Sequence, residues 1–455
     1  MMQPVVRNNA LSDLSGFQGQ WGIEREAIRI RQNGITSARL HPFDDYFPGI
    51  SKDFAECQLE LATGVQPGIA DALADLRELH VRAYEGMKDE LLWPLSMPPL
   101  PNEFSAVYPA VFPNTAVGEQ QEAYRRYLMG KYGAAVMQIS GVHVNFSYDE
   151  ELVSAVYEMS GSRMCRKDFS NNLYMLAARL MLKYAPLALY VLGASPLPGE
   201  YIRRCMLNAG IVAEQIRSGI SYRSSRYGYR NEESRTISFE NLDSYVRSIR
   251  SLIRTPGIRA EAHGSSVFGL ASEKEVYAPV RIKPRGPSAC CSTSLDMLVR
   301  DGVGYIEVRL PDVNPYDPLG IAEAQLHFLR LVFMHSVFMK PETGTPARDT
   351  DKEMALYEWL SLNGAGVEAK TAAVSLLEEL RGTAEILDGS GNDFTYSHML
   401  DSLKRGLMGE AQLLFERVLM DLHAAGGSEG FGIIQAVQHK QRVLEAGYER
   451  IAAAI

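Results

Sequence analysis

The sequence predicts an α+β fold that ends in a mostly helical region. Over about three quarters of the 455 residues, short strand-like segments alternate with amphipathic helical segments, and the remainder has helical periodicity only. Several strand-like segments have one apolar and one polar face, as expected for a sheet with one side on a core. Hydrophobic residues make up 46% of the chain and charged residues 22%, which is typical of a globular protein with a large core.

The charge of the chain favours small, charged metabolites as partners. The formal net charge is −9, and the 46 basic residues are scattered, which argues against a nucleic-acid binder. The first 17 residues lack the continuous apolar stretch of a secretory signal. The most apolar long segment, 173–197, is interrupted by Arg179 and Lys183, so it predicts a buried helix with a following strand or loop rather than a membrane span.

The five cysteines indicate a reducing compartment. Their number is odd, they form no CxxC motif and two of them are adjacent, which fits neither a disulfide framework nor a zinc site. We therefore expect a cytoplasmic protein. Cys57 lies beside residues that carry chemistry, but its simplest interpretation is a small buried thiol.

Helical periodicity is clear in five segments. In 242–253, apolar side chains recur at helical spacing, and Pro256 ends the run. The other segments are 70–92, 149–159, 171–184 and 321–338, and further helices follow after Asp351. No internal repeat or Pro/Gly-rich linker marks a domain boundary in the sequence.

Four segments alternate apolar and polar side chains as strands do. In 21–30, Glu24 and Glu26 share a face only if the segment is extended, because residues two apart on a helix do not face each other. The polar faces of the other three segments (139–147, 277–283 and 302–310) carry His143 with Asn145, Tyr277 with Arg281 and Lys283, and Tyr305 with Glu307 and Arg309.

The composition of these polar faces points to a cation site. Taken alone, each face could be the solvated side of a sheet. Together they offer carboxylates, a histidine with an asparagine, and an arginine with a lysine, and Asp53 and Glu60 add a further acidic segment. Carboxylates about 4 Å apart repel by about 4 kcal/mol at an effective dielectric near 20, so such a cluster persists mainly around a cation. Oxygen-rich clusters suit Mg²⁺.

Mg²⁺ commonly serves phosphate chemistry, and in this chain the residues that bind phosphate would have to lie on the strands of the sheet. The sequence contains no GxxxxGK[ST] motif, so a P-loop enzyme is not expected. It also lacks a GxGxxG motif after a strand, which removes support for a nucleotide redox cofactor. The basic segment 277–283 could instead neutralise phosphates beside the bound metal ions.

Five ordered motifs resemble those of a known enzyme family. They are GIEREAIRI from Gly22, DFAECQLELATGV from Asp53, MQISGVHVNFS from Met137, YAPVRIKPR from Tyr277 and GYIEVRLPDVNPYDPLGI from Gly304. In order and separation they resemble glutamate-cysteine ligase of the proteobacterial type, over residues 20–340. Beyond residue 340 we expect helices without a recognisable motif.

The resemblance implies a fold, a reaction and its cofactors. The fold would be a curved antiparallel sheet of glutamine-synthetase-like type surrounded by helices, with a catalytic domain at 1–340 and a helical C-terminal extension at 341–455 packed on it. The implied enzyme uses ATP and Mg²⁺, or Mn²⁺, to join the γ-carboxylate of glutamate to the amine of cysteine through a γ-glutamyl phosphate, the first step of glutathione synthesis. The implied partners are small molecules, without nucleic acid or membrane, and the protein would be a monomer or a homo-oligomer.

The resemblance also implies roles for individual residues. The metal ligands would be Glu24, Glu26, Asp53, Glu60, His143 and Glu307, with Glu26 and Arg309 as catalytic residues. The substrates would contact Phe54, Tyr124, Leu128, Met137, Arg223, Tyr229 and Tyr277. The residues for ATP would be Arg281, Lys283 and Asn145.

The sequence departs from the family pattern at the acceptor site. The family has a glutamine where this chain, aligned on His143, has Met137, and a strand shifted by one residue turns Gln138 to the opposite face. Arg226 stands where the family commonly has an acidic residue. A ligase of the same superfamily that uses a different amine therefore remains an alternative. A non-catalytic homologue is a third hypothesis, which the intact acidic set opposes.

Overall fold

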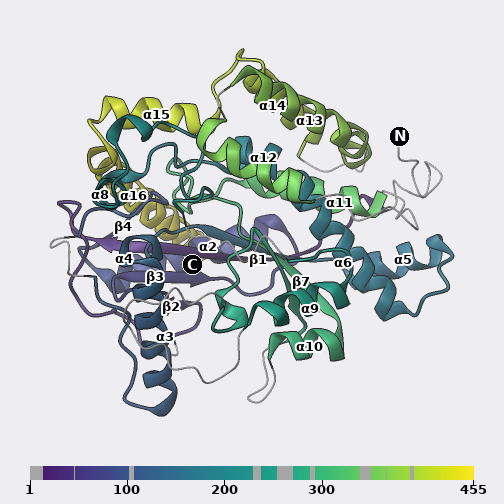
Figure 1. The fold of residues 1–455 in the computed structure, drawn as a ribbon, viewed down its shortest axis with the longest axis horizontal. Helices are drawn as coiled ribbons and strands as arrows, with labels where there is room; N and C mark the ends of the chain where they lie inside the picture. Colours follow the sequence, from purple (N-terminus) through teal and green to yellow (C-terminus); the bar gives the residue numbers. More distant parts are fainter. Residues whose placement is uncertain are drawn as a thin grey trace.

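A seven-stranded antiparallel sheet forms the centre of the structure (Figure 1). The computed structural model describes residues 14–45, 47–101, 107–228, 237–253, 270–286, 293–338, 350–364, 366–389 and 394–454. The strand order is β2-β3-β1-β5-β7-β6, and β4 pairs with the end of β1. The strands are β1 (Gln20–Ile30), β2 (Ile50–Lys52), β3 (Gln58–Ala62), β4 (Leu91–Leu92), β5 (Val142–Ser147), β6 (Val280–Pro284) and β7 (Val303–Val308). The predicted α+β class is confirmed.

The pairing register brings acidic residues of different strands together. The long central strand β1 pairs with β3 on one side and with β5 on the other. Glu26 lies directly opposite Glu60, and Glu24 lies directly opposite His143. Directly opposed residues project from the same face of a sheet, so all four side chains lie on one face.

The other face of the sheet is apolar and packs on helices. Ile23, Val144 and Val308 follow one another across β1, β5 and β7, and all three are fully buried. Helix α2 (Ile69–Met87) contacts β1 and β3, and α6 (Arg166–Lys183) contacts β6 and β7. The alternation of side chains along each strand therefore separates a core face from a polar face.

One buried ion pair is also anchored on β1. Arg29 projects with the odd-numbered residues, and its Nη1 lies 2.7 Å from Oε2 of Glu90. Both side chains are almost fully buried, and the Ser37 hydroxyl donates to the same carboxylate. This cluster lies away from the polar face, and it is a useful reference for a buried acid with a structural role.

Helices enclose the sheet on both sides (Figure 1). Those before residue 340 are, besides α2 and α6, α3 (Ala116–Tyr132), α4 (Ala134–Met137), α5 (Glu150–Ser160), α7 (Ala185–Leu192), α8 (Gly199–Asn208), α9 (Leu242–Leu252), α10 (Ser294–Asp301) and α11 (Glu323–Phe338). The later ones are α12 (Thr350–Asn363), α13 (Val367–Asp388), α14 (Tyr396–Leu407), α15 (Leu414–Ala424) and α16 (Ser428–Ala454). Short 3₁₀ turns lie at Ala213–Gln215 and Glu273–Glu275.

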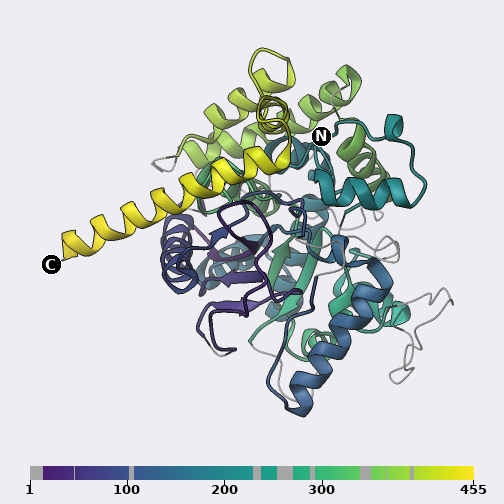
Figure 2. The same ribbon diagram turned by 90° about the vertical axis from the view of Figure 1, so that its left-hand side faces the viewer.

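The late helices pack on the earlier part of the chain. Helix α12 contacts α6 and α7, α13 contacts α11, and α16 contacts α2 and β4. Figure 2 shows α16 crossing the body of the molecule and then extending beyond it towards the C-terminus. These contacts agree with helices after residue 340, as the sequence predicts.

The segment 173–197 differs from its prediction. It contains the end of α6 and then a second helix, α7, rather than a strand or loop. The chain bends by 66° between the two, where Pro186, in the first turn of α7, lacks the N–H that would continue the α6 hydrogen-bond ladder. None of the described helices is alone long and apolar enough to cross a membrane, although this bent pair passes that test by length and composition.

Candidate active site and metal centre

The polar face of the sheet gathers functional side chains from neighbouring strands. In spatial order, β3 contributes Glu60, β1 contributes Glu26 and Glu24, and β5 contributes His143 and Asn145. Next to them, β7 contributes Glu307, with Arg309 just beyond its end, and β6 contributes Arg281 and Lys283. Adjacent strands are about 4.8 Å apart, so side chains opposed across them can meet. The strands predicted from the sequence therefore build one continuous site.

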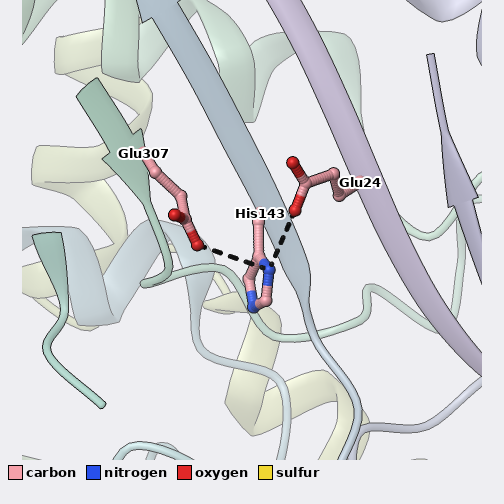
Figure 3. Close-up of side chains that lie close together, drawn as sticks. All are labelled: Glu24, His143 and Glu307. Atoms are coloured by element: carbon pink, nitrogen blue, oxygen red, sulfur yellow. Dashed lines mark ion pairs between the residues drawn. The ribbon is translucent and has the colours of Figure 1, made fainter. Parts of the chain in front are cut away.

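Glu24, His143 and Glu307 form a compact triad (Figure 3). Nδ1 of His143 lies 3.5 Å from Oε2 of Glu24 and 3.9 Å from Oε1 of Glu307. Asn145 donates a hydrogen bond of 2.7 Å to the other oxygen of Glu24. Burial raises the pKa of Glu24, but the hydrogen bonds with His143 and Asn145 outweigh it, so the net shift is downward. The lowered pKa favours the charged carboxylate that a cation site would need.

Glu307 is held by the basic side chains of the site. Nη1 of Arg309 lies 2.6 Å from its Oε1, and Nζ of Lys283 lies 2.7 Å from its Oε2. Burial opposes ionisation, yet Lys283, Arg281 and Arg309 hold the pKa of Glu307 well below its usual range. Arg281 also donates to the carbonyl of Glu273. The carboxylate and the cations thus fix each other at the boundary between the acidic and basic strands.

Three further acids form a second group beside the triad. Glu26 and Glu60 are opposed across β1 and β3, and Asp53 follows β2 directly. Burial, reinforced by the charge of Asp53, raises the pKa of Glu26 to about 8. Burial also raises the pKa of Glu60 and of Asp53, and the neighbouring carboxylates add to the shift of Glu60. The positive charges of the protein around these three carboxylates therefore do not fully offset the cost of ionising them.

The triad suits a divalent cation. One ligand atom from each of Glu24, His143 and Glu307 lies within 4.8 Å of the others. Nε2 of His143 is buried without a hydrogen bond, 3.5 Å from Oε1 of Glu26. Carboxylate oxygens with an imidazole nitrogen are ligands for Mg²⁺ or Mn²⁺. A cation would offset the burial and the repulsion by Asp53 that raise the pKa of Glu26.

A pocket of about 540 Å³ opens beside the acids. Glu26 and Asp53 form one part of its wall. The residues that the resemblance assigned to the substrate and that line the pocket are Phe54, Tyr124, Leu128, Met137 and Tyr277. The structure thus brings five predicted contacts together next to the predicted metal ligands, although their role in binding stays a prediction.

Met137 and Gln138 point in different directions. Met137 is the last residue of the short helix α4 and lines the pocket. Gln138 turns away, donates to the carbonyl of Ala134 and accepts from Sγ of Cys57. The predicted strand 139–147 begins only at Val142, so the divergence comes from a helix end rather than from strand alternation. The pocket therefore contains the apolar thioether of Met137, and the amide of Gln138 lies outside it.

Arg223 reaches the site from a loop. Its Nη1 donates to the carbonyl of Arg309 at 2.9 Å, and both residues line a cavity of about 40 Å³ with Tyr277. Arg226 is exposed and stacks on Tyr227, away from these contacts. Tyr229, the remaining predicted substrate contact, lies outside the described residues.

A second large cavity lies at the Asn145 end of the sheet. Its volume is about 710 Å³ and its wall includes Asn145, Tyr305 and Arg285. Gln20 and Gly22 of β1 also line it, on the same side of the strand as Glu24. The triad therefore lies between two cavities. The smaller is lined by both apolar and polar side chains, and the larger lies beside the basic strand β6.

Comparison with known proteins agrees with this geometry. The glutamate-cysteine ligase family model matches residues 5–355. The chain belongs to the glutamate-cysteine ligase family. It is 29% identical to a glutamate-cysteine ligase of Clostridium acetobutylicum, over 89% of this chain and 92% of that protein, and 30% identical to one of Sodalis glossinidius, over 92% and 86%. Membership of this family makes the protein a ligase and confirms the resemblance read from the motifs.

Solved structures of this family share the fold. The bifunctional glutathione synthetase of Pasteurella multocida aligns with a TM-score of 0.80 at 24% identity, over 98% of this chain, which spans 55% of that protein. The glutamate-cysteine ligase of Francisella tularensis, solved in complex with AMP, aligns with a TM-score of 0.78 at 21% identity, over 94% of this chain and 89% of that one. These alignments support the predicted fold across the sheet and the late helices.

Several residues of the ligase pocket were missed from the sequence. The main ones are Gln120, Gln121 and Arg125 on α3, and Lys274 on the turn before β6. A helical signal was present, because Gln121 precedes Tyr124 by three residues and Leu128 by seven, which places all three on one face of α3. Lys274 carried no comparable signal, since it enters through a turn whose position depends on the tertiary fold.

Proposed function

We propose that the protein joins the γ-carboxylate of glutamate to the amine of cysteine at the expense of ATP, the first step of glutathione synthesis. The observation that carries the proposal is the convergence of six acidic or imidazole side chains, three basic side chains and an adjoining pocket with an apolar patch at one sheet face. Phosphoryl transfer needs such a division between metal ligands and phosphate-neutralising cations. The named activity of the relatives supports the same reaction.

The reaction would proceed in two balanced steps. In the first, an oxygen of the glutamate γ-carboxylate attacks the γ-phosphorus of ATP, the bond to the β-γ bridging oxygen breaks, and ADP leaves. In the second, the amine attacks the carbonyl carbon of the γ-glutamyl phosphate, loses a proton, and expels inorganic phosphate. The acyl phosphate provides the leaving group that a carboxylate lacks.

The acids of the site would hold the metal ions. Glu24, His143 and Glu307 would bind one, and Glu26, Asp53 and Glu60 would complete the second acidic group. When bound, Mg²⁺ or Mn²⁺ neutralises charge on the phosphates and stabilises the charge that develops during transfer. We therefore propose both groups as metal-binding, on the strength of their buried and mutually repelling carboxylates.

The basic residues would orient the phosphates of ATP. Arg309 and Lys283 already contact Glu307 at 2.6 and 2.7 Å, so their charges are fixed beside the triad. Fixed charges stabilise a developing negative charge without reorganising, which is why we assign Arg309 to the transferred phosphoryl group. The cavity of about 710 Å³ beyond Asn145 is large enough for the nucleoside, and Arg285 and Tyr305 line it.

The acceptor would occupy the pocket between α3 and α4. Its wall of Phe54, Leu128 and Met137 is almost fully buried and favours an apolar or sulfur-containing side chain. Met137 also supports the second candidate, a γ-glutamyl ligase with another amine, because the amide of Gln138 does not face the pocket. Both candidates share the phosphoryl chemistry and differ only in the acceptor.

We further propose that residues 1–340 form the catalytic domain and 341–455 a helical extension packed on it. The contacts of α12 with α7 and of α16 with α2 support this division. Cytoplasmic location would suit the free cysteines Cys57, Cys165 and Cys205.

One experiment separates the candidates. Purified protein is incubated with ATP, Mg²⁺ and glutamate, with cysteine or one of a panel of amines, while ADP and phosphate are quantified and products identified by mass spectrometry. The proposal predicts one ADP, one phosphate and one γ-glutamylcysteine per turnover. Equal ADP release with product from another amine but none from cysteine would select the second candidate. No ADP release with any acceptor would contradict both.

A further inference from the structure

A fully buried carboxylate, Asp312, lies beyond the end of β7. It follows β7 in the chain and forms a β-bridge with Gly141. Its Oδ2 accepts from the backbone N–H of Ala194 at 2.8 Å and from the hydroxyl of Ser195 at 2.7 Å. Its Oδ1 accepts from the hydroxyl of Ser221 at 3.0 Å. One carboxylate thus ties together three segments that are distant in the sequence.

These contacts hold the loop that carries Arg223. The hydroxyl of Ser221 accepts from the backbone N–H of Ser224 at 3.1 Å, and the hydroxyl of Ser195 lies 3.3 Å from the backbone N of Arg223 as acceptor. Both hydroxyls donate to Asp312 at the same time. The backbone on each side of Arg223 is therefore fixed by groups that Asp312 orients.

The charge of Asp312 also complements the guanidinium itself. Nη1 of Arg223 lies 3.9 Å from Oδ1 of Asp312, and the arginine side chain is only 8% exposed. An arginine buried to this extent needs a nearby anion to offset its desolvation. Burial raises the pKa of Asp312 above its usual range, and Arg223 and the three hydrogen bonds oppose that rise without cancelling it.

The position of Arg223 is tightly limited on its site side. A Cβ atom at Gly141 would lie only 2.1 Å from Nη2 of Arg223, so only glycine admits the guanidinium there. The backbone N–H of Gly141 donates to Oε2 of Glu26 at 2.8 Å. The guanidinium thus lies between Asp312 and the backbone at Gly141, which in turn contacts the proposed metal ligand Glu26. A small displacement of the guanidinium would therefore change the contacts of the site.

We propose that Asp312 is a positioning residue that acts through Arg223 to bind the carboxylate of glutamate. This inference rests on the proposed function, since it takes a carboxylate group of bound glutamate as the group that enters the small cavity lined by Arg223, Arg309 and Tyr277. Asp312 does not touch the substrate. It fixes the direction of the guanidinium, so that the remaining N–H groups face the cavity.

The test compares Asp312→Asn, Arg223→Lys and the double variant with the wild type. Asparagine keeps the size and one acceptor oxygen but removes the charge. We expect Asp312→Asn to raise the KM for glutamate and its dissociation constant, measured by calorimetry, about ten-fold, as for the loss of one charge-assisted hydrogen bond. The KM for ATP should change less than about two-fold. In the double variant the effect should not exceed that of Arg223→Lys alone, because Asp312 acts through the arginine.

Glu90→Gln is the matched control. Glu90 is a buried acid that pairs with an arginine and a serine, as Asp312 does, but on the other face of the sheet. It should lower the thermal midpoint and leave glutamate binding unchanged. If Asp312→Asn does not fold, Ser221→Ala removes one hydroxyl from the same cluster and should raise the glutamate dissociation constant about three-fold.

Two results would overturn the inference. One is unchanged glutamate binding in the folded Asp312→Asn or Ser221→Ala protein. The other is a double variant whose glutamate dissociation constant rises by the product of the two single-variant factors. Calorimetry keeps the inference separate from the reaction. A wild type that binds glutamate but forms no product contradicts the proposed function only, whereas a wild type that does not bind glutamate contradicts both.

Discussion

Replacing Glu24 by glutamine should remove most of the Mg²⁺-dependent stability. Glu24 is one of the three proposed metal ligands of the triad. Its pKa is lowered by its hydrogen bonds with His143 and Asn145 in spite of burial, so the substitution removes a negative charge. Glutamine keeps the shape and the oxygen that accepts from Asn145 at 2.7 Å. Loss of one charged ligand costs about 2.7 kcal/mol, which is about 100-fold in affinity.

The expected thermal shift follows from these values. At a Mg²⁺ concentration of 100 times the dissociation constant, binding stabilises the wild type by about 2.7 kcal/mol, and the variant by about 0.4 kcal/mol. A 455-residue chain that unfolds as one unit has an unfolding entropy of about 1 kcal/mol per kelvin. Mg²⁺ should therefore raise the wild-type midpoint by about 3 °C and that of Glu24→Gln by less than about 0.5 °C.

The assay is differential scanning fluorimetry across a Mg²⁺ titration, with ADP release measured on the same samples. Glu78→Gln is the control, because Glu78 is exposed on α2 and pairs with Arg82 away from the site. It should keep the full shift. A Glu24→Gln protein with the wild-type shift and wild-type ADP release would refute the assignment of Glu24 as a metal ligand.

Three further predictions concern other parts of the molecule. Lys283→Gln removes the cation 2.7 Å from Glu307 and should raise the KM for ATP about ten-fold, with the KM for the acceptor unchanged. A change in the acceptor KM alone would contradict the assignment of Lys283 to ATP. Met137→Gln places an amide in the pocket and should raise kcat/KM for polar over apolar amines, and an unaltered ratio in a competition assay would argue against a role in selectivity. Burial lowers the pKa of His335 to about 4, so below pH 6.5 its protonation favours the unfolded chain by about 1.4 kcal/mol per pH unit. In urea unfolding, His335→Gln should therefore reduce the loss of stability between pH 6.5 and 5. An unchanged slope would mean that His335 titrates normally in the folded protein.

The polar face of the sheet could be predicted from the sequence because it depends on local rules. Alternation on a strand is fixed by backbone geometry, so Glu24 and Glu26 had to share a face once 21–30 was extended. The same rule applied to His143 with Asn145 and to Glu307. The resemblance implied an antiparallel sheet, but the spatial order of its strands, which alternation alone does not contain, came from the structure.

The acceptor side could be predicted only in part because it depends on how helices dock. Met137 was placed on a strand, yet it ends α4, because Gly133 turns the chain at a φ of 88° and a helical turn precedes β5. Lys274 reaches the pocket through a 3₁₀ turn, and Asp312 joins segments more than 90 residues apart. Such contacts follow from tertiary packing and leave no periodic pattern in the sequence.

In the proposed function, the phosphoryl chemistry and the choice of acceptor depend on different parts of the fold. The triad and the basic strand are built on β1, β5, β6 and β7, whose register is fixed by a buried apolar face, so a shift of one residue would bury charges. The wall of the proposed acceptor pocket instead comes in large part from α3, together with Met137 of α4, and a side chain there can change without moving a strand. Glu26 is the point of contact between the two, because it lines the acceptor pocket and is opposed to Glu60. Substitution of Met137 should therefore alter selectivity alone, whereas substitution of Glu26 should impair both steps of the reaction.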